Sequence, residues 1–287
     1  GAGDAAGAGE PSDAAANAYW EDPYSDRGER ILVRPSQLEA FVKCPLHWFL
    51  NYHGGSTSDF AASVGTLVHR AMELATSASE ESLWEEVESS WHTLQFESAW
   101  IEQAERRKAQ KLVANLAKYL SQFEASGAKV LAAEADFELK LGKAKVVGKV
   151  DRIELTPEGG VVVVDLKTGS SIPTNQEAAK HPQLGLYQLA VENGAFSSVN
   201  EVVEGRVVSG GAKLLLVAGD NFAERLQPAI SGEPQAREYF EDLVSSAADG
   251  MAAPNSIFIA NVSSHCDNDN EFGSCRMHIT KAVSHVG

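Results

Sequence analysis

The sequence lacks the apolar runs that a membrane span requires. No stretch approaches the roughly 18 consecutive apolar residues of a spanning helix, and no basic segment leads into an apolar one at the start. We therefore expect a cytoplasmic protein with no membrane partner. Its 287 residues suffice for one large domain or two modest ones, with a sizeable buried core.

Basic residues are also scarce. The chain has 24 Lys and Arg against 40 Asp and Glu, which gives a formal net charge of −16. This balance argues against a surface coated in basic side chains for nucleic acid. A local basic groove is still compatible with it, because much of the acid lies in the N-terminal tail and in "SASEESLWEEVESSW".

Cysteine is rare too, and the three present, Cys44, Cys266 and Cys275, cannot all pair with one another. Without an export signal we expect no disulfide, so buried thiols compete with a metal or cluster role.

The first 29 residues are rich in Gly, Ala, Asp and Ser without apolar periodicity, which is typical of a linker. The folded domain is expected over 30–287. It should open with a helix that Ser36 caps, with Glu39 at the capping-box position and Pro45 as a kink. Apolar spacing predicts further helices over 63–78, 81–100, 101–125, 176–194 and 233–252.

Between these helices the apolar period changes to two. Residues 133–141, 145–155 and 160–169 read as successive antiparallel strands, and 201–219 as two more strands around a turn at Gly210 and Gly211. The pattern predicts an α/β fold with a central mixed sheet flanked by helices and a helical N-terminal region.

The stretch "GKVDRIELTPEGGVVVVDLKTG" carries charged residues inside apolar strands. If 156–160 form the loop, Leu155 faces Val161, and Asp151 and Asp165 are cross-strand neighbours roughly 4.5–5.5 Å apart at Cβ. Lys167 then lies on the same face of the sheet as Asp165.

Two carboxylates at this separation repel unless a cation lies between them or one is protonated. Mg²⁺ or Mn²⁺ prefers such ligands, and a neighbouring lysine can orient or deprotonate a water, or stabilise charge on a phosphate. The alternative is a surface ion pair between Asp165 and Lys167, with Asp151 solvated. The valine run predicts burial on both faces, which disfavours that alternative.

Asp151 followed by Asp165-Leu166-Lys167 resembles the acid…(D/E)-x-K signature of the PD-(D/E)XK nuclease superfamily. Three other segments are similar to motifs of its RecB-like branch and occur in family order: "KCPLHWFLNYHGG", "GTLVHRAMELA" and "QLGLYQLA". The resemblance spans Ser36 to Cys275. It implies the restriction-endonuclease-like fold of that superfamily.

The resemblance also implies roles for residues outside the hairpin. His69, four residues after Gly65, would face the metal together with Glu134, for which Glu138 is a competitor. Gly65 would let its helix approach the sheet closely. Gln183 and Tyr187 are four residues apart on one helix face and would position a phosphate or the catalytic lysine.

Several RecB-like nucleases hold a [4Fe–4S] cluster with one N-terminal cysteine and a C-terminal C-x₂-C-x₅-C. Cys44, Cys266 and Cys275 match this pattern, but Asp269 stands at the middle position. Three readings stay open: Asp269 or His265 completes a cluster, the set binds zinc, or the site is vestigial and closed by packing. Each places the tail 255–287 near Cys44.

The resemblance is nearest to the nuclease domains of bacterial helicase–nucleases of the RecBCD, AddAB and AdnAB group. It implies Mg²⁺- or Mn²⁺-dependent cleavage of single-stranded DNA, exonucleolytic rather than endonucleolytic, in double-strand-break repair. The partners would be an upstream helicase motor, whose Walker A pattern this sequence lacks, and a second helicase–nuclease subunit. The alternative is a catalytically inactive nuclease-like scaffold or DNA-end-binding module.

Overall fold

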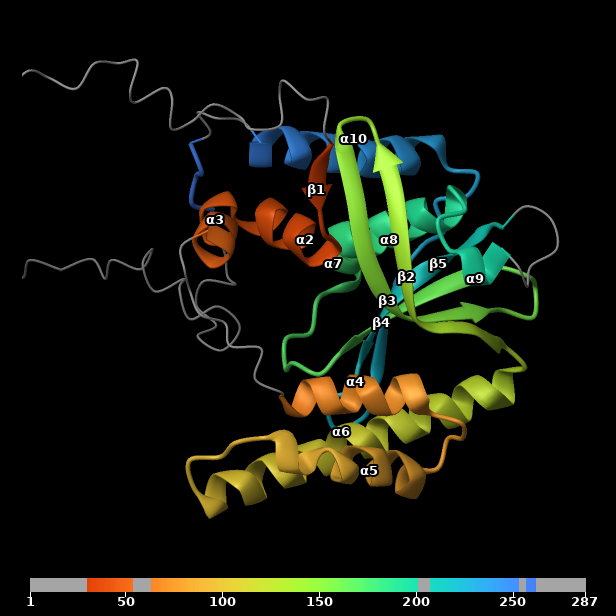
Figure 1. Cartoon of the computed structure of the whole chain (residues 1–287). Helices are drawn as coiled ribbons and strands as arrows, with labels where there is room; N and C mark the ends of the chain where they lie inside the picture. Colours follow the sequence, from red (N-terminus) through yellow and green to blue (C-terminus); the bar gives the residue numbers. More distant parts are fainter. Residues whose placement is uncertain (1–29, 54–62, 201–206, 253–256, 262–287) are drawn as a thin grey trace, which may run out of the picture.

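A six-stranded mixed sheet forms the centre of the computed structural model, which describes residues 30–53, 63–200, 207–252 and 257–261 (Figure 1). The strands are β1 (Ile31–Val33), β2 (Lys129–Leu141), β3 (Ala144–Leu155), β4 (Val161–Lys167), β5 (Ser209–Leu216) and β6 (Ala223–Gln227). Their order is β1-β3-β4-β5-β6, and β2 pairs with the other edge of β3. The expected mixed α/β sheet is confirmed.

The long strand β3 has two different neighbours on one edge. Its first residues, 144–146, pair with β1 in parallel, and its last residues, 152–155, pair with β4 in antiparallel. Between them, 147–151 pair with no strand on that edge in the described ladders. The charged residues of the expected site lie at this opening, so the divergence of β1 and β4 creates room for it.

The hairpin register agrees with the sequence-based prediction. Leu155 pairs with Val161, and Arg152 pairs with Val164. Val161 and Val163 are buried in one apolar core, while Val164 and Leu166 are buried in the other. The valine run is therefore buried on both faces of the sheet, as predicted.

Helices cover both faces of the sheet (Figure 1). One core packs α2 (Pro35–Lys43), α8 (Pro182–Glu192) and α10 (Pro234–Ala252) against the sheet. The other packs α4 (Val64–Leu74), α5 (Glu80–Ser89) and α6 (Ala99–Ser126). The remaining helices are short: α3 (Pro45–His53), a 3₁₀ turn (Trp91–Thr93), α7 (Asn175–Ala179) and α9 (Ser197–Asn200).

Three local predictions were wrong in their details. The N-cap of α2 is Arg34, not Ser36, because Pro35 occupies the first helical turn, where its fixed φ is pre-organised. The helix expected over 176–194 is divided before Pro182, which has no N–H to continue α7. The helix expected over 81–100 ends at Ser89.

The pair Gly210-Gly211 is not a hairpin turn. Both residues lie inside β5, which runs parallel to β4, and the register shifts beside Val162. Gly211 has φ +117°, so it forms an irregularity in the strand instead of reversing it. Gly210 also passes so close to Gly160 that a side chain would not fit easily.

The described part of the tail, 257–261, lies against α3. The Leu46 N–H donates to the Ile259 carbonyl at 3.4 Å, and the Phe258 ring stacks on Phe49 at 4.7 Å. Cys44 lies immediately before α3. Among the described helices, none combines the length and apolar character needed to cross a membrane.

Candidate active site

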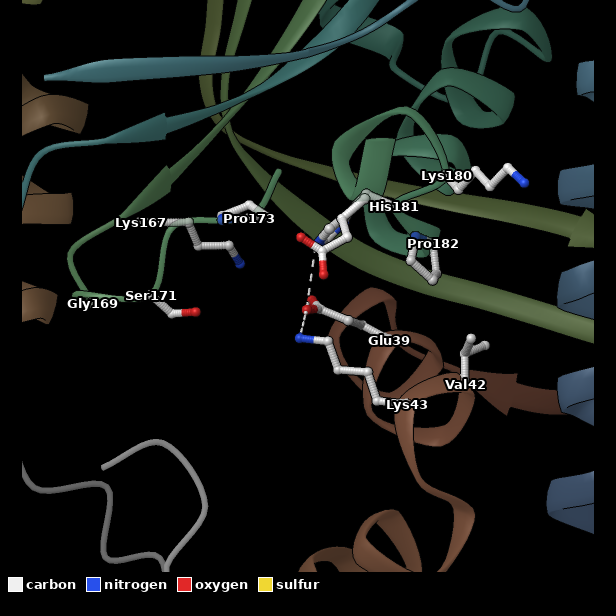
Figure 2. A pocket seen from close by; sticks show the side chains of 11 residues that line it. Glu39, Val42, Lys43, Lys167, Gly169, Ser171, Pro173, Lys180, His181 and Pro182 are labelled. Carbon is white, nitrogen blue, oxygen red and sulfur yellow. Dashed lines mark hydrogen bonds and ion pairs between the residues drawn. The ribbon is translucent and has the colours of Figure 1, made fainter. Parts of the chain in front are cut away.

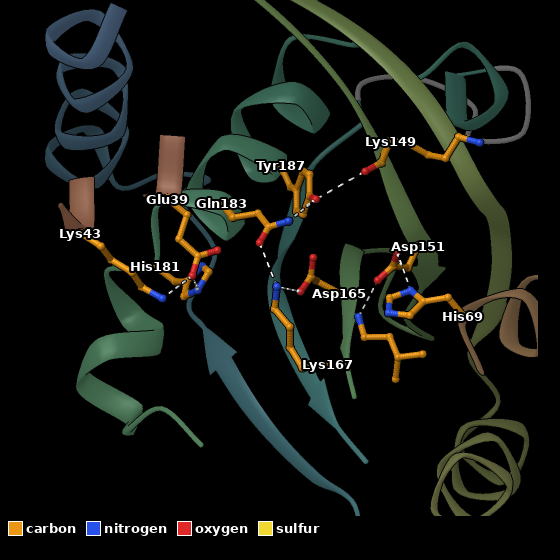
Figure 3. A network of polar contacts seen from close by, with 11 residues as sticks. Glu39, Lys43, His69, Lys149, Asp151, Asp165, Lys167, His181, Gln183 and Tyr187 are labelled. Atoms are coloured by element: carbon orange, nitrogen blue, oxygen red, sulfur yellow. Dashed lines mark hydrogen bonds and ion pairs between the residues drawn. The ribbon is translucent and has the colours of Figure 1, made fainter. Parts of the chain in front are cut away.

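A cavity opens at the end of β4, where Lys167 is part of its wall (Figure 2). It has a volume of about 430 Å³ and lies between α2, the loop that follows β4, and the start of α8. Lys167 also takes part in a polar network that extends to the opening in the edge of β3 (Figure 3). This lysine therefore connects the cavity to the charged residues of the hairpin.

Asp151 closes the gap between β3 and β4 with its side chain. Its Oδ2 accepts a hydrogen bond from the Leu166 N–H at 2.6 Å, where the regular ladder has already ended. Its Oδ1 lies 3.2 Å from His69 Nδ1 on α4. A Cβ on Gly65 would lie 2.6 Å from Thr168 Oγ1, so the glycine allows α4 to approach the end of β4.

Glu134 reaches the same place from β2. Its flanking residues pair with Arg152 and Val150, which puts Glu134 opposite Asp151 in the register. Glu134 has φ +47°, a left-handed backbone that is uncommon for a residue with a side chain. The ladder is therefore interrupted at the position where Glu134 turns toward Asp151.

His69, Glu134 and Asp151 form a group that could hold a metal ion. Their ligand atoms all lie within 4.8 Å of one another, and all three side chains are half-buried. Imidazole nitrogen and carboxylate oxygens suit Mn²⁺ and related divalent ions. Asp165, the fourth metal ligand expected from the sequence, lies next to this group and acts on it electrostatically.

Asp165 is almost fully buried and imperfectly neutralised. Its Oδ2 lies 3.0 Å from Lys167 Nζ but has no hydrogen-bond partner among the described residues, so the contact is an ion pair without good alignment. Burial raises the pKa of Asp165; the charge of Lys167 opposes this, and Asp151 adds to it. A cation beside Asp165 would relieve this unfavourable arrangement.

A chain of hydrogen bonds fixes Lys167 on its other side (Figure 3). Lys167 Nζ donates to Gln183 Oε1 at 3.1 Å, and Gln183 Nε2 donates to Tyr187 Oη at 2.7 Å. Tyr187 in turn contacts the Lys149 carbonyl at 3.4 Å, on the open edge of β3. The structure thus brings together all the expected residues of α8 and β4.

The charge states follow from these contacts. Burial alone would lower the pKa of Lys167, but the carboxylates of Asp165 and Glu39 outweigh it and raise the pKa. Burial would also lower the pKa of His69, and its contact with Asp151 outweighs that effect, so this pKa is raised. Burial and Asp151 raise the pKa of Glu134, against the opposing effect of Lys149. Lys167 is therefore a permanent cation beside a crowded set of acids.

A second polar group, which the sequence patterns did not predict, lies at the cavity. Glu39 Oε1 lies 2.7 Å from Lys43 Nζ and 3.3 Å from His181 Nε2 (Figures 2 and 3). Burial would raise the pKa of Glu39, but His181, Lys167 and Lys43 together hold it well below its usual range. The predicted capping-box role of Glu39 is wrong, and no local pattern indicated that it would meet His181.

Glu138 and Cys44, the other candidates among the described residues, are not part of this site. Glu138 is exposed on β2 and pairs with Lys145 at 2.9 Å, so it does not join Glu134. Cys44 is buried and accepts the His47 N–H at 3.5 Å. Its proposed partners Cys266, Asp269 and Cys275, and the alternative His265, lie outside the described residues. The iron–sulfur or zinc site stays a prediction.

The model of one protein family, the PD-(D/E)XK nuclease superfamily, matches residues 33–277. The chain belongs to this superfamily. The matched region of this PD-(D/E)XK domain includes the Asp151, Asp165 and Lys167 set on β3 and β4.

Solved structures resemble the PD-(D/E)XK domain at low sequence identity. A proposed exonuclease from Eubacterium rectale is 13% identical with a TM-score of 0.44, over 87% of this chain and 97% of that one. A protein named SSO0001 is 12% identical with a TM-score of 0.32, and the match covers 80% of this chain and 88% of that one. No curated protein matches the sequence significantly. The assignment rests on the family model alone.

Proposed function

We propose that this PD-(D/E)XK domain is a metal-dependent deoxyribonuclease that hydrolyses phosphodiester bonds in single-stranded DNA. One observation carries the proposal: a His–Glu–Asp group with ligand atoms within 4.8 Å of one another lies beside Lys167, a charged and partly buried lysine. Carboxylates next to a lysine at the edge of a cavity are what phosphodiester hydrolysis with a divalent ion requires.

The residues present fit a divalent cation. His69, Glu134 and Asp151 would hold it, and Asp165, whose buried oxygen has no hydrogen-bond partner among the described residues, would join them. Mg²⁺ or Mn²⁺ is the expected ion, because three of the four ligands are carboxylates. When bound, such an ion supplies charge neutralisation at the phosphate and activation of water.

Lys167 acts as a fixed positive charge. The carboxylates of Asp165 and Glu39 raise its pKa, and its ammonium is suited to donate to the oxygen on which charge develops. Gln183 aims this ammonium, and Tyr187 holds Gln183. Burial raises the pKa of the Tyr187 phenol well above its usual value, so it stays a neutral donor to the Lys149 carbonyl.

We further propose that the domain works within a helicase–nuclease in double-strand-break repair, as the motifs around Cys44, His69 and Gln183 suggest. A motor would deliver one strand to the cavity, which favours exonucleolytic cutting. Affinity would then come from the whole assembly, so an acidic nuclease domain is compatible with DNA binding. A cytoplasmic location is part of this proposal.

The test is degradation of end-labelled single-stranded DNA with Mg²⁺ or Mn²⁺, run beside EDTA. We expect metal-dependent cutting that Asp165→Ala abolishes and Asp242→Ala, an exposed aspartate on α10, leaves intact. The labelled end that disappears first gives the polarity. If the folded domain does not cut and calorimetry detects no Mn²⁺ binding, the proposal is wrong and the inactive scaffold is favoured.

A further inference from the structure

The cavity beside Lys167 extends away from the metal ligands. Its lining includes the amines of Lys43, Lys167 and Lys180 and the apolar side chains of Val42, Pro173 and Pro182. His69, Glu134 and Asp151 are not part of that lining. A molecule in the cavity would thus contact the catalytic lysine from the side opposite the metal site.

The charge of this wall differs from that of the whole chain. The lining has three lysines and two glutamates, Glu39 and Glu177, and the Lys180 ammonium is turned outward, so this wall is close to neutral in a protein of net charge −16. Both glutamates have partners: Glu39 pairs with Lys43 and His181, and Glu177 accepts bonds from Thr174 at the start of α7. An anionic ligand therefore meets cations here in an otherwise acidic molecule.

Lys43 and Lys167 approach the cavity from different walls. In Figure 2 their ammonium groups point toward the middle of the cavity, from α2 and from the end of β4, while the Lys180 ammonium is turned outward. Glu39 fixes the Lys43 ammonium at 2.7 Å, and Gln183 fixes that of Lys167 at 3.1 Å. Both cations are held in place before any ligand binds, which lowers the entropy cost of contacting two anions.

Size restricts the occupant. The volume of about 430 Å³ is in the lower part of the roughly 300–1,000 Å³ range of small-molecule sites, enough for one nucleotide but not for several. The proline and valine surfaces offer an apolar wall for a sugar or base, and the lysines are suited to its phosphates.

We propose that this cavity binds the single nucleotide next to the scissile phosphate, with Lys43 on the outer phosphate of that nucleotide and Lys167 on the scissile one. This proposal rests on the proposed nuclease function and deepens it, because it assigns the strand a direction from the metal ligands toward α2. Lys43 is then a DNA-binding residue distinct from the catalytic group.

The experiment measures binding of fluorescent oligothymidylate to the whole chain in EDTA, at several salt concentrations, so it does not depend on cutting. Lys43→Gln should reduce the slope of log affinity against log salt by about 0.7, the contribution of one phosphate contact on a single strand. Lys108→Gln is the control, since Lys108 also pairs with a glutamate on a helix, at 3.6 Å, away from the cavity.

A second pair of variants fills the cavity without changing charge. Ser171 lines the cavity and Ser170 does not, although both lie in the same loop. Ser171→Trp should weaken binding about tenfold or more by excluding the nucleotide, and Ser170→Trp should not. Circular dichroism confirms that both variants fold.

The outcomes separate the two proposals. An unchanged salt slope in Lys43→Gln together with equal binding by the two tryptophan variants overturns the cavity proposal, as does a chain that binds no oligothymidylate. If cutting depends on Asp165 while the cavity variants bind normally, the nuclease stands and the cavity assignment falls. If the cavity variants lose affinity but the wild-type chain never cuts, the cavity still binds a nucleotide, and both the nuclease and the assignment of a scissile phosphate to Lys167 are wrong.

Discussion

Two charged clusters occupy opposite faces of the same sheet. One contains Asp151, Asp165 and Lys167; the other contains Arg152, Glu154 and Lys213, from β3 and β5. Because side chains alternate along a strand, Asp151 and Arg152 point to different faces. Sequence composition alone does not tell these clusters apart, since both put charge into apolar strands.

The cluster around Glu154 is electrostatically satisfied. Glu154 accepts a hydrogen bond from Tyr119 at 2.6 Å and from Arg152 at 2.8 Å, and Lys213 lies 3.2 Å away. Arg152 also covers the Phe123 ring at 4.5 Å. Every acidic oxygen of Glu154 has a cation or donor, so this cluster has the properties of a structural one.

The cluster around Asp165 is not satisfied. It combines three carboxylates, a strained backbone at Glu134 and an Asp165 oxygen without a hydrogen bond among the described residues. Such features cost stability and persist where function requires them. Charges and hydrogen-bonding groups that lack partners, more than burial or charge alone, therefore distinguish a candidate functional site from a structural cluster.

The largest expected effect concerns Asp151. Asp151→Asn should reduce nuclease activity by about 10²–10³-fold or more, because the proposed metal site loses one of its ligands. The same change removes repulsion from Asp165 and Glu134 and weakens the contacts with the Leu166 N–H and His69, so the free energy of unfolding should change by no more than about 1 kcal/mol. Activity assays and urea unfolding measure both. A large loss of stability would mean that Asp151 mainly stabilises the fold, as Glu154 does. Asp242→Asn is the control.

Glu154→Gln should have the opposite effects to Asp151→Asn: a large loss of stability and no loss of activity. Removing one charge of a buried, paired network leaves Arg152 without its carboxylate partner, while Lys213 keeps Glu224 at 2.8 Å; this costs about 3–5 kcal/mol of unfolding free energy. Nuclease activity per folded molecule should not change. Urea unfolding of this variant beside Glu158→Gln, an exposed position in the same hairpin, checks the prediction. If Glu154→Gln were stable but inactive, the proposal that the Glu154 cluster is structural and the Asp165 cluster functional would be wrong.

Gln183→Ala tests how far the functional cluster extends. Lys167 would lose the bond that aims its ammonium, so kcat should fall about 10–100-fold with KM little changed. Tyr187 is one hydrogen bond further from Lys167, so Tyr187→Phe should reduce kcat by about tenfold or less. Gln235→Ala, on the surface of α10, is the control. An equal reduction of kcat in the two α8 variants would contradict the expectation that the effect on Lys167 weakens with each further hydrogen bond.

Sequence patterns were sufficient where the interactions are local. The hairpin register followed from the five-residue loop between Leu155 and Val161, and the helix after Glu233 followed from its apolar spacing. The patterns failed where distant segments meet. Glu39 and His181 are far apart in the chain, and a glycine pair inside a parallel strand reads like a turn until the strand beside it is known.

The smallest expected effect is the strain at Glu134. Its φ of +47° is tolerated better by asparagine, so Glu134→Asn should raise the free energy of unfolding by about 0.5–1 kcal/mol. The variant loses a carboxylate ligand, so its affinity for Mn²⁺ should fall in a calorimetric titration. Glu138→Asn, on the same strand but not among the residues with positive φ, should show no gain in stability and normal Mn²⁺ binding. If Glu134→Asn is less stable than the wild type, the strain is not stored there, and the contrast between the clusters must rest on the unpaired oxygen of Asp165.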